Sequence, residues 1–140
     1  DTYTITFSYK AIMKHMPYDT HEGEWSVEVS WDHIFAILSP SMINEANEYR
    51  MILLISDYLE TECKEAIFDN CGDHDLDMES VRIFESDFHT IIIQIRALGL
   101  IEKSTKSRSV KDSGTYWTLT SYGDDTMTKL RAIKSSNSQK

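Results

Sequence analysis

The sequence predicts an α+β fold: a core of three helices, followed by a hairpin with a long loop and a closing helix, and preceded by an added β-hairpin. Three observations predict it. Apolar and polar residues alternate near the N-terminus, as in half-buried strands, and apolar residues recur at helical spacing from residue 34 onward. A helical pattern ending at Gly99 then leads through a polar, basic segment to a further strand pattern and a last helical pattern.

Length and composition fit one globular domain. The chain has 140 residues, of which 41% are hydrophobic and 26% charged, so it can bury a core and lacks the composition of a disordered chain. Apolar runs such as Met51 to Ile55 are far shorter than the ~20 residues that cross a bilayer, and residues 1–20 do not form a secretion signal. Cys63 and Cys71 lack a second pair and are predicted to be reduced thiols. We therefore expect a cytoplasmic protein that does not bind membranes.

Two N-terminal strands follow from the period-two patterns over residues 4–9 and 25–31. The segment 16–23 between them contains Pro17, Asp19 and Gly23, which favour a hairpin loop. The two strands are therefore predicted to pair.

Two helices are predicted next. Ser30 or Asp32 caps a short helix that Pro40 stops, and Asn44 caps a longer helix running to about Ile67. The middle of the longer helix is apolar on all sides, which indicates that other elements enclose it.

The following segment, 69–79, is acidic and contains Gly72, so it is predicted to be a loop, with a short strand over 81–84. Ser86 is expected to cap the third helix, and Gly99 to end it in the left-handed conformation. The residues expected to point inward from this helix are Phe88, Ile91, Ile92, Ile95 and Leu98.

The C-terminal third is predicted to contain a strand at 100–102, a basic loop at 103–114, a returning strand at 116–119 and a last helix capped by Thr120 or Ser121. The residues expected to point inward from that helix are Met127, Leu130 and Ile133.

This order of elements is typical of a winged-helix domain, in which the basic loop is the wing. We assign the winged helix to residues 31–134, an N-terminal β-hairpin extension to residues 1–30, and a disordered tail to residues 135–140.

Four segments also resemble a bacterial family of unknown function, from about Phe7 to Lys134. They are VSWDHIF, ILSPSMINEA, DFHTIIIQIRALGLIEKS and SVKDSGTYWTLTSYGDDTMTKLRAI, and they include Gln94 and the run Ala97 to Ile101. Members of that family join an N-terminal module resembling the Toll/interleukin-receptor or deoxyribosyltransferase fold to a winged-helix tail. The resemblance implies that this chain is a fragment of a larger protein, and it transfers no catalytic residue.

The helix at 86–98 takes the position that DNA-binding winged helices place in the major groove. Its residues His89, Thr90 and Gln94 are candidates for contact with base edges. Asp87, however, would face phosphate unfavourably, and Ile93 stands where a cation is normally useful. Base readout by this helix is therefore the less favoured interpretation.

The basic loop is the better nucleic-acid candidate. Its cations are Lys103, Lys106, Arg108 and Lys111, interleaved with serines and a threonine that also suit phosphate contact. The alternative is a solvated hairpin tip whose charges serve solubility.

Charge divides unevenly along the chain. Residues 1–90 hold 5 Lys and Arg against 19 Asp and Glu, whereas residues 91–140 hold 9 against 4, and the formal net charge is −9. This balance argues against indiscriminate coating of nucleic acid, because distant carboxylates repel a polyanion.

No metal, cofactor or enzymatic site is predicted. Cys71 and His74 have the spacing of half a zinc site, but no second ligand pair follows. The alternating acids at 73–79 begin like a calcium loop but lack its glycine and its last glutamate. No nucleophile is paired with a base, and no small-molecule substrate is evident.

The leading interpretation is a non-enzymatic module for protein association or regulation within a larger bacterial cytosolic protein. Ile93, on the outward side of its helix, and Trp25 are the candidate association residues. We expect Ile93 to be covered by another chain or by residues 1–30, and DNA binding through the wing is the alternative.

Overall fold

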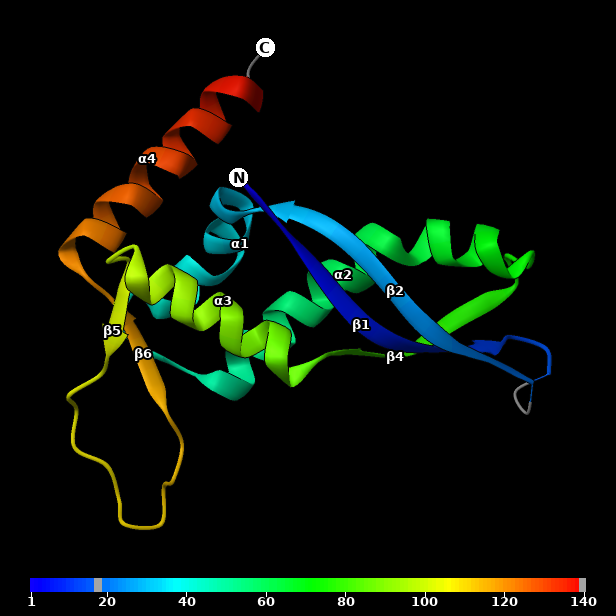
Figure 1. The fold of residues 1–140 in the computed structure, drawn as a ribbon, viewed down its shortest axis with the longest axis horizontal. Helices are drawn as coiled ribbons and strands as arrows, with labels where there is room; N and C mark the ends of the chain where they lie inside the picture. Colours follow the sequence, from blue (N-terminus) through cyan, green and yellow to red (C-terminus); the bar gives the residue numbers. More distant parts are fainter. Residues whose placement is uncertain (17–18, 139–140) are drawn as a thin grey trace.

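The computed structural model describes residues 1–16 and 19–138, with side chains as far as residue 132. The predicted α+β class is confirmed: the described residues contain four α-helices and two antiparallel three-stranded sheets (Figure 1). The elements in chain order are β1 (Thr2–Met13), β2 (Thr20–Ser30), α1 (Trp31–Leu38), the 3₁₀ helix η1 (Ser39–Met42), β3 (Ala46–Asn47), α2 (Glu48–Cys71), β4 (Leu76–Ile83), α3 (Glu85–Ala97), β5 (Ile101–Lys103), β6 (Tyr116–Leu119) and α4 (Ser121–Ser138).

The first sheet has the strand order β2-β1-β4, and α2 packs against it (Figure 1). The predicted pairing of the two N-terminal strands is confirmed over Thr2–Ile12 and Thr20–Ser30, although Pro17 in the connection lies outside the described residues. Trp31 begins α1 rather than ending β2, with Ser30 as the predicted cap, accepting from the N–H of His33. The inward residues of β1 are Ile5, Phe7, Tyr9 and Ala11.

The acidic segment 69–79 is not a loop throughout, which corrects the sequence analysis. The helix α2 continues to Cys71 and ends where Gly72 has a φ of 72°. From Leu76 the chain pairs with β1, and Asp77 and Glu79 take the exposed positions of the strand. Pairing with a distant strand outweighs the unfavourable local composition.

Two predicted helix caps are also corrected. Asn47, not Asn44, caps α2 by accepting from the N–H of Arg50 at 2.8 Å, because residues 46–47 first pair with β6. At α3 the cap is Phe84, whose own N–H pairs with the carbonyl of Thr6, and Ser86 lies inside the helix. Both starts are displaced by pairing to a strand far away in the sequence.

The end of α3 agrees with the sequence in one respect and differs in another. Gly99 has a φ of 76°, which confirms the predicted left-handed end. Leu98 was expected inward, but its side chain is 47% exposed, since the turn carries it out of the buried stripe. The buried residues of α3 are Phe88, Ile91, Ile92 and Ile95.

The second sheet has the order β3-β6-β5 and holds the base of the basic loop. The loop residues 104–115 carry no helix or strand. Thr120 caps α4 by accepting from the N–H of Gly123 at 2.9 Å, as predicted. The helix extends to Ser138 and projects from the body (Figure 1), which corrects the disordered tail for residues 135–138, while residues 139–140 lie outside the described part.

Met127 and Leu130 of α4 pack partly buried against the core, whereas the side chain of Ile133 is outside the described residues. Among the described helices, none combines the length and the apolar character that crossing a membrane requires.

Candidate interaction surface

The outward face of α3 is the first candidate surface. The three predicted base-reading residues, His89, Thr90 and Gln94, all lie on α3. His89 and Thr90 are exposed, and Gln94 is half-buried. The ring of His89 lies 3.7 Å from the carboxylate of Glu85, and the hydroxyl of Thr90 donates to the carbonyl of Ser86 at 2.9 Å. Two of the three polar groups thus face partners within their own helix.

Ile93 lies on the same face and is 66% exposed. Its neighbour one turn on, Ala97, is exposed as well. The described part of this segment, residues 1–16 and 19–30, does not cover Ile93, which corrects one of the two coverings expected for it. The other covering, a second protein chain, stays a prediction.

Asp87 does not face the solvent side as the sequence analysis supposed. Its carboxylate accepts from the hydroxyl of Tyr3 at 2.5 Å and from the backbone N–H of Thr6 at 2.9 Å. Burial, followed by this hydrogen bond, raises the pKa of Tyr3. Asp87 therefore ties α3 to β1 and is not placed to repel phosphate.

Trp25, the second predicted association residue, stands directly across from Phe7 on the inward side of the sheet. It is half-buried and packs against the core. Its inner side therefore contributes to the core, and the association role predicted for Trp25 stays a prediction.

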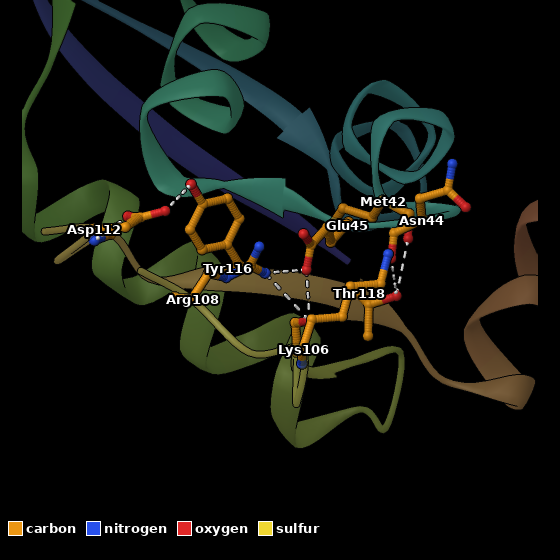
Figure 2. A network of polar contacts seen from close by, with 10 residues as sticks. Met42, Asn44, Glu45, Lys106, Arg108, Asp112, Tyr116 and Thr118 are labelled. Atoms are coloured by element: carbon orange, nitrogen blue, oxygen red, sulfur yellow. Dashed lines mark hydrogen bonds and ion pairs between the residues drawn. The ribbon is translucent and has the colours of Figure 1, made fainter. Parts of the chain in front are cut away.

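The carboxylate of Glu45 anchors the basic loop (Figure 2). Glu45 pairs with the guanidinium of Arg108 and accepts from the hydroxyl of Ser104 at 2.5 Å. The side chains of Glu45 and Arg108 are 15% and 26% exposed. The bonds from Arg108 and then Ser104 lower the pKa of Glu45 to about 2, so the pair is ionised at neutral pH.

Arg108 is also packed over an aromatic ring. Its guanidinium carbon lies 3.6 Å from the centroid of Tyr116, whose hydroxyl donates to Asp112 at 2.8 Å (Figure 2). A guanidinium suits such stacking because it is planar and weakly hydrated. Arg108 is one of the four predicted phosphate contacts. Glu45 neutralises its charge, and the ring of Tyr116 covers part of its guanidinium.

The three lysines of the loop are exposed. The amine of Lys103 lies 6.0 Å from the centroid of Trp117, whose ring also faces the guanidinium of Arg96 at 5.3 Å. Among the described residues, Lys106 and Lys111 make no ion pair. The loop thus brings together the cations that the sequence grouped and leaves the lysines open to solvent.

Sequence reasoning did not identify Glu45 as the residue that fixes the loop. Glu45 is 63 residues from Arg108 and precedes a short strand, so no spacing rule links the two. The only signal was an isolated acid beside a helix start, which is too common to be useful.

Cys71 and His74 lie at the junction of α2 and β4, and Figure 1 shows this junction at the right of the molecule, away from α3 and the wing. His74 pairs with Asp69 at 2.8 Å and Glu65 at 3.8 Å. Within residues 1–16 and 19–138, no group of three or more His, Cys, Asp and Glu side chains has the geometry to hold a metal ion.

Comparison with family models, with curated proteins and with solved structures found no match for this chain.

Proposed function

We propose that this chain is a non-enzymatic protein-association module with a winged-helix fold, acting within a larger bacterial cytosolic protein. Its partner binds the outward face of α3. Three helices, α1, α2 and α3, are followed by β5, β6 and α4, with η1, β3 and β4 between the helices. This order supports the winged helix, since a wing joins two strands between the third helix and the last one. The resemblance to the bacterial family supports the larger protein.

The observation that carries this proposal is the exposure of Ile93 at the centre of α3. An exposed Ile alone is ordinary, but here it occupies the face that a groove-binding helix would fill with cations. Glu85 in the first turn of the helix is exposed, and the guanidinium of Arg96 lies over the ring of Trp117. This face suits an apolar partner surface better than a phosphate backbone.

Ile93→Glu tests this proposal, with Tyr49→Glu as the matched control because Tyr49 is 70% exposed on another helix. In isolation both variants should keep the wild-type melting temperature, since neither side chain is buried. Light scattering should show association of the wild-type chain, or of the chain within its larger protein, that Ile93→Glu abolishes and Tyr49→Glu retains. Equal association in wild type and Ile93→Glu would refute the role of α3.

DNA binding through the wing is the second candidate, and the open lysines Lys106 and Lys111 favour it. If DNA binds, the affinity should be weak and steeply dependent on salt, because phosphate contacts release counterions. The double variant Lys106→Ala, Lys111→Ala should then weaken binding to all sequences alike, whereas Lys64→Ala, Lys129→Ala on other elements should not. Anisotropy of a labelled duplex at two salt concentrations measures this, and equal affinities of both double variants would eliminate the wing.

A further inference from the structure

The strand β2 forms an open edge of the first sheet. It pairs with β1 on one side over its whole length, from Thr20 to Ser30, and the strand order β2-β1-β4 places no described strand on its other side. An edge strand presents a row of unpaired backbone groups that a further strand can use.

The register identifies which backbone groups are free. The N–H of Trp31 donates to the carbonyl of Asp1 at 3.2 Å, and that of Met13 donates to the carbonyl of Asp19 at 3.1 Å. The odd-numbered residues of β1 therefore exchange hydrogen bonds with β2. The even-numbered Thr6 makes its backbone hydrogen bonds on the side away from β2. Its N–H donates to the carboxylate of Asp87, and its carbonyl accepts from the N–H of Phe84.

In an antiparallel pair, the residues between the hydrogen-bonded ones direct their N–H and C=O groups away from the partner strand. On β2 these are the residues opposite the even-numbered positions of β1. The residues that present backbone groups at the open edge are Thr20, Glu22, Glu24, Ser26, Glu28 and Ser30.

The side chains of these same residues form a row on the exposed face of the sheet. The row is acidic because it contains three glutamates, Glu22, Glu24 and Glu28. Glu24 stands opposite Ser8, and Glu28 stands opposite Thr4. Neither glutamate has a cation across from it, and among the described residues neither forms an ion pair. A strand added at this edge would meet two unpaired carboxylates on its outer face.

The third acid of the row is only weakly compensated. Lys10 stands opposite Glu22, but its amine lies 3.9 Å from that carboxylate and 3.2 Å from Glu79 on the other side. Lys10 is therefore shared between two acids. Arg82 of β4, opposite Ser8, is a second cation on this face, but Glu22, Glu24, Glu28 and Glu79 outnumber the two cations, so the face stays negative.

The inward face of the edge is apolar. Trp25 and Val27 alternate with the acids and pack against the core while remaining half-buried. Apolar side chains on an added strand would extend this layer and cover the exposed parts of both residues.

We propose that the open edge of β2 binds an extended segment of a partner protein as an added strand, and that this segment carries Lys or Arg at alternate positions with apolar residues between them. The cations meet Glu22, Glu24 and Glu28, and the apolar residues meet Trp25 and Val27. Backbone hydrogen bonds supply affinity, and the two sets of side chains supply selectivity. This surface is separate from the α3 face.

The edge of β2 is not suited to pairing with a second copy of this chain. Antiparallel pairing of two β2 strands centred on Ser26 places Glu24 against Glu28 at both ends of the pair. Like charges directly opposite each other destabilise a strand pair. The acidic row therefore opposes self-pairing and favours a basic strand.

The test uses a labelled, end-blocked peptide in which Lys alternates with Val and Thr, and a counterpart with Glu in place of Lys. Fluorescence anisotropy should show binding of the Lys peptide to the wild-type chain and at least about tenfold weaker binding of the Glu peptide. The double variant Glu24→Gln, Glu28→Gln should weaken the Lys peptide, whereas Asp57→Asn, Glu62→Gln, which removes the same charge from exposed sites on α2, should not.

Ser26→Pro separates strand addition from mere attraction of charge. The N–H of Ser26 points to the open edge, so proline removes no hydrogen bond to β1 but blocks an added strand. The control Ser26→Ala removes only the hydroxyl, which lies 2.8 Å from that of Thr6. Binding should fall at least about tenfold in Ser26→Pro and persist in Ser26→Ala.

Hydrogen exchange of the wild-type chain gives a reading that needs no variant. On addition of the Lys peptide, the amides of Glu24, Ser26 and Glu28 should become protected. Unchanged exchange at these amides, equal binding by Ser26→Pro, or equal binding of the two peptides would overturn the proposal. A wild-type dimer that Ser26→Pro dissociates would also overturn it, in favour of a second copy.

Discussion

The guanidinium carbon of Arg108 lies 3.6 Å from the centroid of the Tyr116 ring, and the same guanidinium pairs with Glu45. A loop that the sequence shows only as basic and polar is thus closed by a carboxylate from another part of the chain. This contact fixes Arg108. It leaves the lysines of the loop as the accessible cations.

Glu45→Gln should loosen the wing without unfolding the domain. Glutamine keeps the shape of the side chain but loses the charge that holds Arg108. Amides in residues 104–115 should exchange faster with solvent, while those of α2 and β1 should not change. Glu102→Gln, at an exposed site in β5, is the control, and the same slow exchange in Glu45→Gln as in wild type would show that the ion pair does not order the loop.

The same contact predicts a dependence of stability on pH. The pKa of Glu45 is lowered from 4.5 to about 2, so its contribution to folding is fully present above pH 4.5 and is lost as the pH falls from there through about 2. The difference in melting temperature between wild type and Glu45→Gln should therefore be constant from pH 7 to pH 5 and shrink below that. A difference that stays the same down to pH 2 would contradict this assignment.

Asp87→Ala should destabilise the fold by removing the link between α3 and β1. It leaves the hydroxyl of Tyr3 and the N–H of Thr6 without their shared acceptor, and hydrogen bonds to a charged group contribute about 1.5–3 kcal/mol. Tyr3→Phe removes only one of the two bonds and should therefore cost less than Asp87→Ala, which removes both. Urea unfolding of both variants measures the difference, and the prediction fails if Asp87→Ala is no less stable than Tyr3→Phe.

Gly123→Ala should also destabilise the domain, for a steric reason. A Cβ atom at Gly123 would lie 2.0 Å from the carbonyl oxygen of Leu100, so α4 must move away from the turn between α3 and β5. Overpacking of this kind costs about 1–3 kcal/mol. Gly114→Ala is the control, because its nearest neighbour is the exposed side chain of Asp112. Thermal melting should separate the two variants, and equal melting temperatures would show that α4 shifts freely.

The elements that depend on local chemistry were predictable from the sequence. Alternation identified β1, β2 and β6, Ser30 and Thr120 were recognised as caps, and Gly99 was placed correctly as a left-handed helix end. Each of these rests on groups within a few residues of one another, which a single sequence displays directly.

The errors have a common physical cause, which is competition from a partner distant in the sequence. Asn44 has the side chain of a good cap, yet Asn47 is used because residues 46–47 pair with β6. The acidic composition of β4 predicts a loop, but in the fold this segment pairs with β1 and forms a strand. Backbone groups take the partner that the whole fold offers, and local preference is too weak to prevent it.

The sequence by itself determined the α+β class, the order of most elements, the exposed Ile93 and the set of cations in the wing, because these depend on periodicity and on residue type. Only the tertiary structure decided how those residues are used. It pairs Arg108 with Glu45, turns Asp87 inward to Tyr3, packs Trp25 on the core and leaves β2 at an edge. These outcomes depend on contacts between residues far apart in the chain, whose geometry is set when the sheets and helices pack together.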